Sequence, residues 1–118
     1  MDEQVLVLNA DIHRLSSALL AQADDSWSDM QMQTLIIIQE ASERLVVLVA
    51  TPPYGDPDHW LHDLRSPGAS MLSAISLLLD EIEYTPSSLD RTAAEKLYDQ
   101  IVRLRSAVDA MFGQQEER

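Results

Sequence analysis

The chain has 118 residues, a length that suits one domain with a real core and is too short for two independently folded enzymatic units. Eight Lys and Arg residues against 20 Asp and Glu residues give a net charge of −12. Because binding to nucleic acid or to an anionic membrane depends on clustered basic side chains, this balance argues against both as partners. The sequence contains no cysteine, which excludes disulfides, thiolate catalysis and cysteine-based zinc sites.

The first residues, Met1-Asp2-Glu3-Gln4, lack the positive charge that opens a secretory signal. The longest apolar stretches, residues 35–38 and 45–50, fall far short of the roughly 20 residues that a membrane span requires. We therefore expect a cytoplasmic protein that has no membrane partner.

The first predicted helix occupies about residues 5–19, where apolar residues recur at spacings of three and four. A second helix is predicted over residues 27–50 and is apolar on more than one face. Ser26, followed three residues later by Asp29, resembles a capping box at its start.

Residues 51–56 contain two prolines and a glycine, which predict a break in the chain. Asp56 is expected to cap a third helix whose first residue is Pro57 and which runs to about Glu83. After a turn at residues 84–88, the same apolar spacing predicts a fourth helix, ended by Gly113.

These elements predict an all-α fold, an antiparallel four-helix bundle made of two helical hairpins, residues 1–50 and 57–113, in a single domain spanning residues 1–118. The sequence leaves two ways of completing the bundle. The four helices of one chain can complete it, or two chains can complete it as a homodimer.

The third predicted helix carries the hexapeptide His62-Asp63-Leu64-Arg65-Ser66-Pro67. It resembles the phosphoacceptor box of two-component sensor histidine kinases, in which His is followed by an acid, an aliphatic residue, a base, Ser or Thr, and Pro. All six positions match. The resemblance implies that residues 57–113 are similar to the dimerisation and histidine phosphotransfer (DHp, HisKA-like) hairpin of those kinases.

The chemistry of the box is consistent with phosphotransfer. Imidazole changes its charge near neutral pH, so His62 offers a nitrogen nucleophile that accepts the phosphoryl group. Asp63 is the candidate general base or orienting group for its ring. Arg65 is the candidate source of electrostatic stabilisation for the anion, and a position near the helix start adds a favourable field.

Pro67 and Gly68 form the candidate hinge, because the proline removes a backbone donor and glycine weakens a helix. In the kinases the residue after the proline is a bulky aliphatic, so Gly68 departs from the pattern. Their helices also continue upstream of the histidine, whereas Pro52, Pro53 and Pro57 interrupt the helix here.

A short alignment also pairs His13 with His62, each preceded by an aliphatic residue and followed two positions later by leucine. If the two hairpins were distant repeats, one chain would imitate the kinase dimer, and His13 would be a degenerate copy of the phosphoacceptor.

The resemblance implies a two-component signalling protein that exchanges a phosphoryl group between His62 and the aspartate of a response-regulator receiver domain, or takes it from a histidine kinase. We expect no ATP-binding domain and no cofactor in this chain, so Mg and ATP would belong to partners. The alternatives are a non-catalytic, kinase-derived module that binds a receiver domain or kinase, and a fragment of a larger histidine kinase. We expect no metal site, although His59 and His62 share a helical face.

Overall fold

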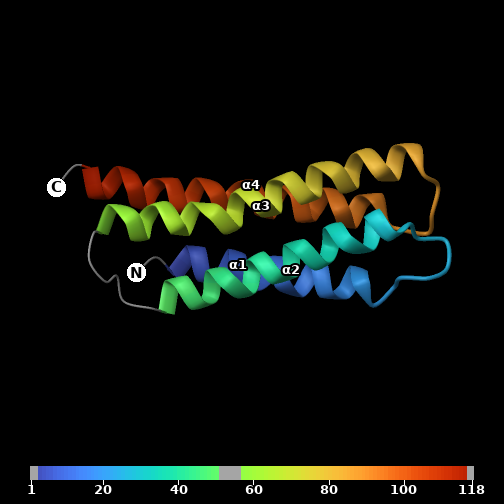
Figure 1. Ribbon diagram of the computed structural model, residues 1–118, viewed down its shortest axis with the longest axis horizontal. Helices are drawn as coiled ribbons and strands as arrows, with labels where there is room; N and C mark the ends of the chain where they lie inside the picture. Colours follow the sequence, from blue (N-terminus) through green and yellow to red (C-terminus); the bar gives the residue numbers. More distant parts are fainter. Residues whose placement is uncertain (1–2, 51–56, 117–118) are drawn as a thin grey trace.

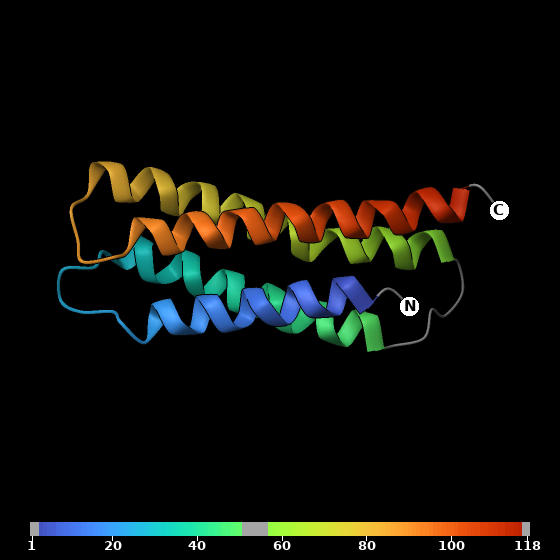
Figure 2. The same cartoon turned by 180° about the vertical axis from the view of Figure 1, so that it is seen from behind.

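The computed structural model describes residues 3–50 and 57–116, and in it the chain forms α1 (Glu3–Leu20), α2 (Asp29–Ala50), α3 (Pro57–Tyr84) and α4 (Arg91–Glu116). Figures 1 and 2 show an antiparallel bundle in which successive helices run in opposite directions along a rod of 50 × 21 × 20 Å. α1 packs against α2 and α4, and α3 packs against the same two helices. The predicted all-α fold is therefore confirmed, and the bundle closes within one chain.

The core follows the apolar spacing of the sequence. Ile12, Ile38, Ile75 and Ile101, one from each helix, are fully buried. Burying one such side chain contributes about 1.5–3 kcal/mol, so stripes that continue along all four helices stabilise the bundle over its length. Helix propensity alone does not account for elements this long, because most helical stability in proteins comes from packing an amphipathic face.

The start of α2 differs from the prediction. Ser28 and Gln31 form the capping box, since the Gln31 backbone N–H donates to Ser28 Oγ at 3.1 Å and the Ser28 N–H donates to Gln31 Oε1 at 3.0 Å. The predicted pair of Ser26 and Asp29 is wrong because the Ser26 hydroxyl bonds to Asp24 instead. The helix consequently begins at Asp29, two residues later than expected.

A group of polar side chains joins the α1–α2 loop to the α3–α4 loop at one end of the bundle. The indole N–H of Trp27 donates to Ser88 Oγ at 2.9 Å, and the Ser88 hydroxyl donates to Asp24 Oδ2 at 2.6 Å. The Ser88 backbone N–H donates to Ser26 Oγ at 2.9 Å. Trp27 itself is buried in the core. We call Asp24, Ser26, Trp27 and Ser88 the loop clasp; it holds the two hairpins together.

The loop clasp predicts a difference between the wild type and Asp24→Asn on acidification. Hydrogen bonds from the side chains of Ser26 and Ser88 lower the pKa of Asp24. Because the folded pKa lies below the ordinary value of about 3.9, this stabilisation is present above that pH and is lost as pH falls through the folded pKa. We expect the advantage of the wild type in free energy of unfolding, measured with urea, to shrink between pH 6 and pH 3. An equal difference in free energy of unfolding between the wild type and Asp24→Asn at pH 6 and pH 3 would contradict this role of the Asp24 carboxylate.

The remaining helix boundaries mostly match those predicted from the sequence. α3 begins at Pro57 as predicted, while the break at residues 51–56 and the proposed cap Asp56 lie outside the described residues. The predicted end at Gly113 is wrong, because α4 continues to Glu116. A helical glycine costs only about 1 kcal/mol, and the Gln and Glu residues that follow favour a helix. No helix in the described ranges has the length and hydrophobicity needed to cross a membrane.

Candidate functional site

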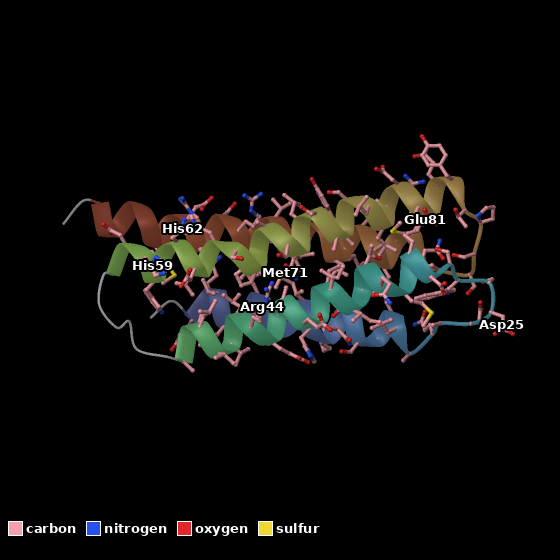
Figure 3. All side chains as sticks on the ribbon, viewed as in Figure 1. Asp25, Arg44, His59, His62, Met71 and Glu81 are labelled. Carbon is pink, nitrogen blue, oxygen red and sulfur yellow. The ribbon has the colours of Figure 1, made fainter. Side chains whose placement is uncertain are left out.

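The hexapeptide forms a regular part of α3. Leu61 and Leu64 are buried in the core, with 5% and 1% of their surface exposed, and between them His62 is exposed. Figure 3 shows His62 and His59 near the end of the rod at which α3 begins. The core therefore fixes the backbone that carries His62, while its imidazole remains open to a partner molecule.

Asp63 has a different imidazole neighbour from the one the sequence suggested. Its Oδ2 lies 3.7 Å from Nε2 of His59, and both side chains are substantially exposed. Successive helical residues point about 100° apart, whereas residues four apart lie on one face. The adjacent His62 and Asp63 therefore diverge, and His59 and Asp63 meet.

Arg65 connects α3 to α4. Its Nε donates to Oδ1 of Asp109 at 3.0 Å, and about half of each side chain is exposed. An exposed ion pair of this kind contributes only about 0–1 kcal/mol, since water screens it. This pair therefore joins α3 to α4 without adding much to the stability of the bundle.

The field of the helix start acts only weakly on His62. α3 begins at Pro57, so His62 lies in its second turn. The favourable field for an anion falls off within the first turn of a helix. The field of the helix start is therefore weaker at His62 than was expected from the sequence.

Pro67 and Gly68 are buried and lie inside α3, which continues through them to Tyr84. Figure 1 shows α3 changing direction between its green and yellow parts, the region that contains these residues. A proline inside a helix removes one hydrogen bond of the ladder and is a common cause of a bend. Pro67 lies about one turn beyond His62, and its role as a hinge stays a prediction.

Gly68 also leaves room for the side chain of Arg105 from α4. A Cβ atom at this position would lie 3.1 Å from Cγ of Arg105, closer than ordinary van der Waals contact. Because Arg105 is exposed and its side chain is flexible, a shift of a few tenths of an ångström relieves this contact.

Gly68→Ala is therefore expected to stabilise the fold. Replacing a glycine inside a helix by alanine gains up to about 1 kcal/mol, and the displaced Arg105 stem offsets only part of this. The free energy of unfolding from urea titration measures the effect. Ala69→Gly, at the exposed neighbouring position, is the control and should lose a similar amount. A loss of stability in Gly68→Ala would mean that the Arg105 stem is held in place.

A cavity of about 320 Å³ opens beside the hexapeptide, between α2, α3 and α4. Its leucine and valine neighbours are buried in the core, and its charged neighbours are exposed; the lining residues are Leu45, Leu64, Leu104, Val108, Gly68, Arg65, Arg105 and Asp109. No pattern in the sequence indicated the cavity or the α4 residues Arg105 and Asp109. Only the register between α3 and α4 brings these two side chains to the site, and no sequence motif marks it.

His13 lies at a different height in the bundle from His62. Nε2 of His13 is 3.4 Å from Oε1 of Glu43 in α2, and the next residue, Arg44, donates to Ser70 of α3 at 3.4 Å. His13 is thus roughly level with Ser70, about 12 Å along the axis from His62 at 1.5 Å per residue. In the proposed repeat the two histidines would be level, so His13 is no structural counterpart of His62.

Within residues 3–50 and 57–116, the structure contains no group of three or more metal-ligating side chains arranged around a common point. No family model matches the chain, and no curated protein or solved structure is similar to it at a significant level.

Proposed function

We propose that this protein is a histidine phosphotransfer protein in which His62 carries the phosphoryl group. An imidazole nitrogen of His62 attacks the phosphorus atom of a receiver-domain aspartyl phosphate. A nitrogen–phosphorus bond forms as the phosphorus–oxygen bond breaks, and the aspartate leaves as a free carboxylate. The other ring nitrogen then releases its proton. The reverse reaction passes the group to a second receiver domain.

The observation that carries the proposal is the exposure of His62 on a helix whose neighbouring residues are fixed in the core. A nucleophile on a rigid element is held in one orientation, which favours in-line attack on a docked phosphoryl group. The six-residue match to the phosphoacceptor box gives this exposed histidine a chemistry that most surface histidines lack.

Two neighbouring side chains assist in the proposed reaction. Asp63 accepts the proton that the His62 ring releases through one bridging water molecule, once its carboxylate has left the ion pair with His59. Arg65 leaves Asp109 and donates to the phosphoryl oxygens, where a guanidinium forms paired hydrogen bonds. Both of their present ion pairs are exposed and therefore cost little to break.

The second candidate function is a non-catalytic module that binds a receiver domain or a kinase through the same face. The engagement of Asp63 with His59 and of Arg65 with Asp109 favours it, because neither side chain contacts His62 in these pairs. In that case the net charge of −12 would favour a partner with a basic rim. Substitution of His62 would then leave the function intact.

Incubation with receiver domains phosphorylated by acetyl phosphate tests the proposal. We expect the phosphoryl group to appear on this protein as a species that acid hydrolyses and alkali preserves, the behaviour of a phosphorus–nitrogen bond. Receiver domains without acetyl phosphate are the control. Binding of phosphorylated receivers without transfer, across a panel of receivers and kinases, would support the binding module and contradict the phosphotransfer function.

A further inference from the structure

We propose that the outward groove between α1 and α2 docks an amphipathic helix of a partner protein, one whose apolar stripe is flanked by basic side chains. Leu6, Ala10, His13, Glu43 and Val46 define this α1–α2 groove, a hollow of about 420 Å³. The inference goes beyond phosphotransfer and does not depend on His62. It rests on the apolar surface that the groove exposes, on its fixed floor and on the charges beside it.

The α1–α2 groove leaves apolar side chains accessible to a partner. Leu6 of α1 and Val46 of α2 are 37% and 51% exposed, and most of the accessible lining is apolar. Ala10, which lines the same groove, is small and allows a helix to approach closely. An amphipathic helix inserts apolar side chains spaced by three and four residues into a groove of this kind, and their transfer from water supplies the driving force.

Hydrogen bonds between α1 and α2 fix the floor of the groove. The side-chain amide of Asn9 donates to the backbone oxygen of Ser42 at 3.0 Å, and the Ser42 hydroxyl donates to the backbone oxygen of Asn9 at 3.3 Å. Both residues are buried and line the groove from below. Because these bonds join the two helices in the free protein, the groove is formed before a partner arrives, and binding requires less ordering.

The charges beside the groove favour a basic partner. Glu43 lines it, and Glu3 lies three residues before Leu6 on the same face of α1; both carboxylates are exposed. No lysine or arginine is among the residues that line the groove, since Arg14 of α1 lines a hollow towards α4 and Arg44 of α2 reaches α3. A second copy of this chain would bring the same carboxylates and a net charge of −12, whereas basic flanks meet opposite charge.

A helix in this groove leaves the hexapeptide uncovered. Figures 1 and 2 show the α1–α2 hairpin along one side of the rod and the α3–α4 hairpin along the other. All residues that line the groove belong to α1 and α2, whereas His62 is exposed on α3. The partner helix can therefore hold the protein in a complex while His62 remains open to a second molecule.

Three synthetic helical peptides of about five turns test the proposal. The first has a leucine stripe flanked by lysines, the second has the same stripe flanked by glutamates, and the third has the composition of the first with its leucines spread around the helix. Each is titrated into the full chain, and amide chemical shifts are followed by NMR. We expect the first peptide to bind at least about tenfold more tightly than the others, with the largest shifts at Leu6, Ala10 and Val46. Absence of binding by the first peptide, or equal binding by either of the others, would overturn the proposal.

Val46→Lys and Val102→Lys form a matched pair, because both replace an exposed valine and only Val46 lines the groove. Val46→Lys puts a positive charge among the apolar contacts and should weaken binding of the lysine peptide about tenfold or more, while Val102→Lys should leave it unchanged. Equal weakening by both variants would indicate a general charge effect and overturn the site. Both variants are checked for folding by circular dichroism; if Val46→Lys does not fold, the glutamate pair described next decides.

Glu43→Gln and Glu40→Gln test the charges in the same way. Both remove one exposed carboxylate from α2, and only Glu43 lines the groove. Glu43→Gln should weaken binding of the lysine peptide about threefold, the effect of losing one exposed ion pair, and Glu40→Gln should have a smaller effect. Equal effects of the two variants would contradict a role of Glu43 in docking.

Sedimentation equilibrium of the wild-type protein tests the other possible occupant. We expect a monomer, because the carboxylates of a second copy would repel those of the groove. A dimer that Val46→Lys dissociates would make the groove an interface between copies of this chain and overturn the proposal.

Discussion

His62→Gln is expected to abolish phosphoryl transfer from a phosphorylated receiver domain while leaving the fold and partner binding intact. Glutamine has no ring nitrogen that can form the phosphoramidate bond, so the loss should be complete rather than partial. Because His62 is exposed, the substitution should change the free energy of unfolding by no more than about 0.5 kcal/mol. Transfer is measured with radiolabelled phosphate, and partner binding by calorimetry.

His59→Gln is the matched control for this experiment. His59 lies three residues earlier on the same helix, and 75% of its side chain is exposed. It should transfer at close to the wild-type rate, and faster transfer would be consistent with release of Asp63 from the ion pair. Loss of transfer in His59→Gln, with His62→Gln still active, would show that His59 and not His62 carries the phosphoryl group.

Trp27→Ala is expected to cause the largest loss of stability among the substitutions considered. Only 7% of Trp27 is exposed, and truncation of a buried tryptophan to alanine costs about 3–5 kcal/mol. The substitution also removes the indole N–H that donates to Ser88, so the loop clasp loses its connection to the core. Urea denaturation followed by circular dichroism measures the change.

Trp27→Phe separates packing from hydrogen bonding in the same position. Phenylalanine retains most of the apolar surface but has no N–H group, so we expect a loss of about 1 kcal/mol from the hydrogen bond. If Trp27→Ala lowered the free energy of unfolding by as little as Trp27→Phe does, the result would contradict the burial of Trp27 and its role in joining the two loops.

The fold could be predicted from the sequence because the spacing of apolar residues along the chain is regular and can be read from each segment separately. Leu61, Leu64, Met71, Ile75 and Leu78 recur at three-four spacing, and the structure buries each of them in the core. A stripe of this kind fixes which face of a helix points inward. The closure of the bundle was not predictable in this way, because the same stripes can be buried within one chain or between two.

The start of α2 shows where local patterns become ambiguous. Ser26 and Ser28 are each followed three residues later by a side chain that can accept a hydrogen bond, so either could begin the helix. The choice depends on tertiary contacts: Ser26 bonds to Asp24 and Ser88, which leaves the cap to Ser28. A sequence pattern does not contain those contacts.

In the candidate site, too, the local features could be predicted and the tertiary contacts could not. The motif and its position on a helix could be predicted, and the structure places His62 on an exposed helical surface. The partners of Asp63 and Arg65 were not predicted. Asp63 meets His59 because residues four apart lie on one face of a helix, and Arg65 meets Asp109 because of the register between α3 and α4. The cavity lined by Arg105 also depends on that register.

Site mapping on the wild-type protein tests the central claim most directly. After transfer from a phosphorylated receiver domain, the protein is digested at alkaline pH with trypsin and the fragments are sequenced by tandem mass spectrometry. Cleavage at arginine places His59 and His62 on one peptide, residues 45–65, whose fragment ions distinguish them. We predict that the phosphoryl group is found on His62. A phosphoryl group on His59, on His13 or on an acidic side chain would contradict the account.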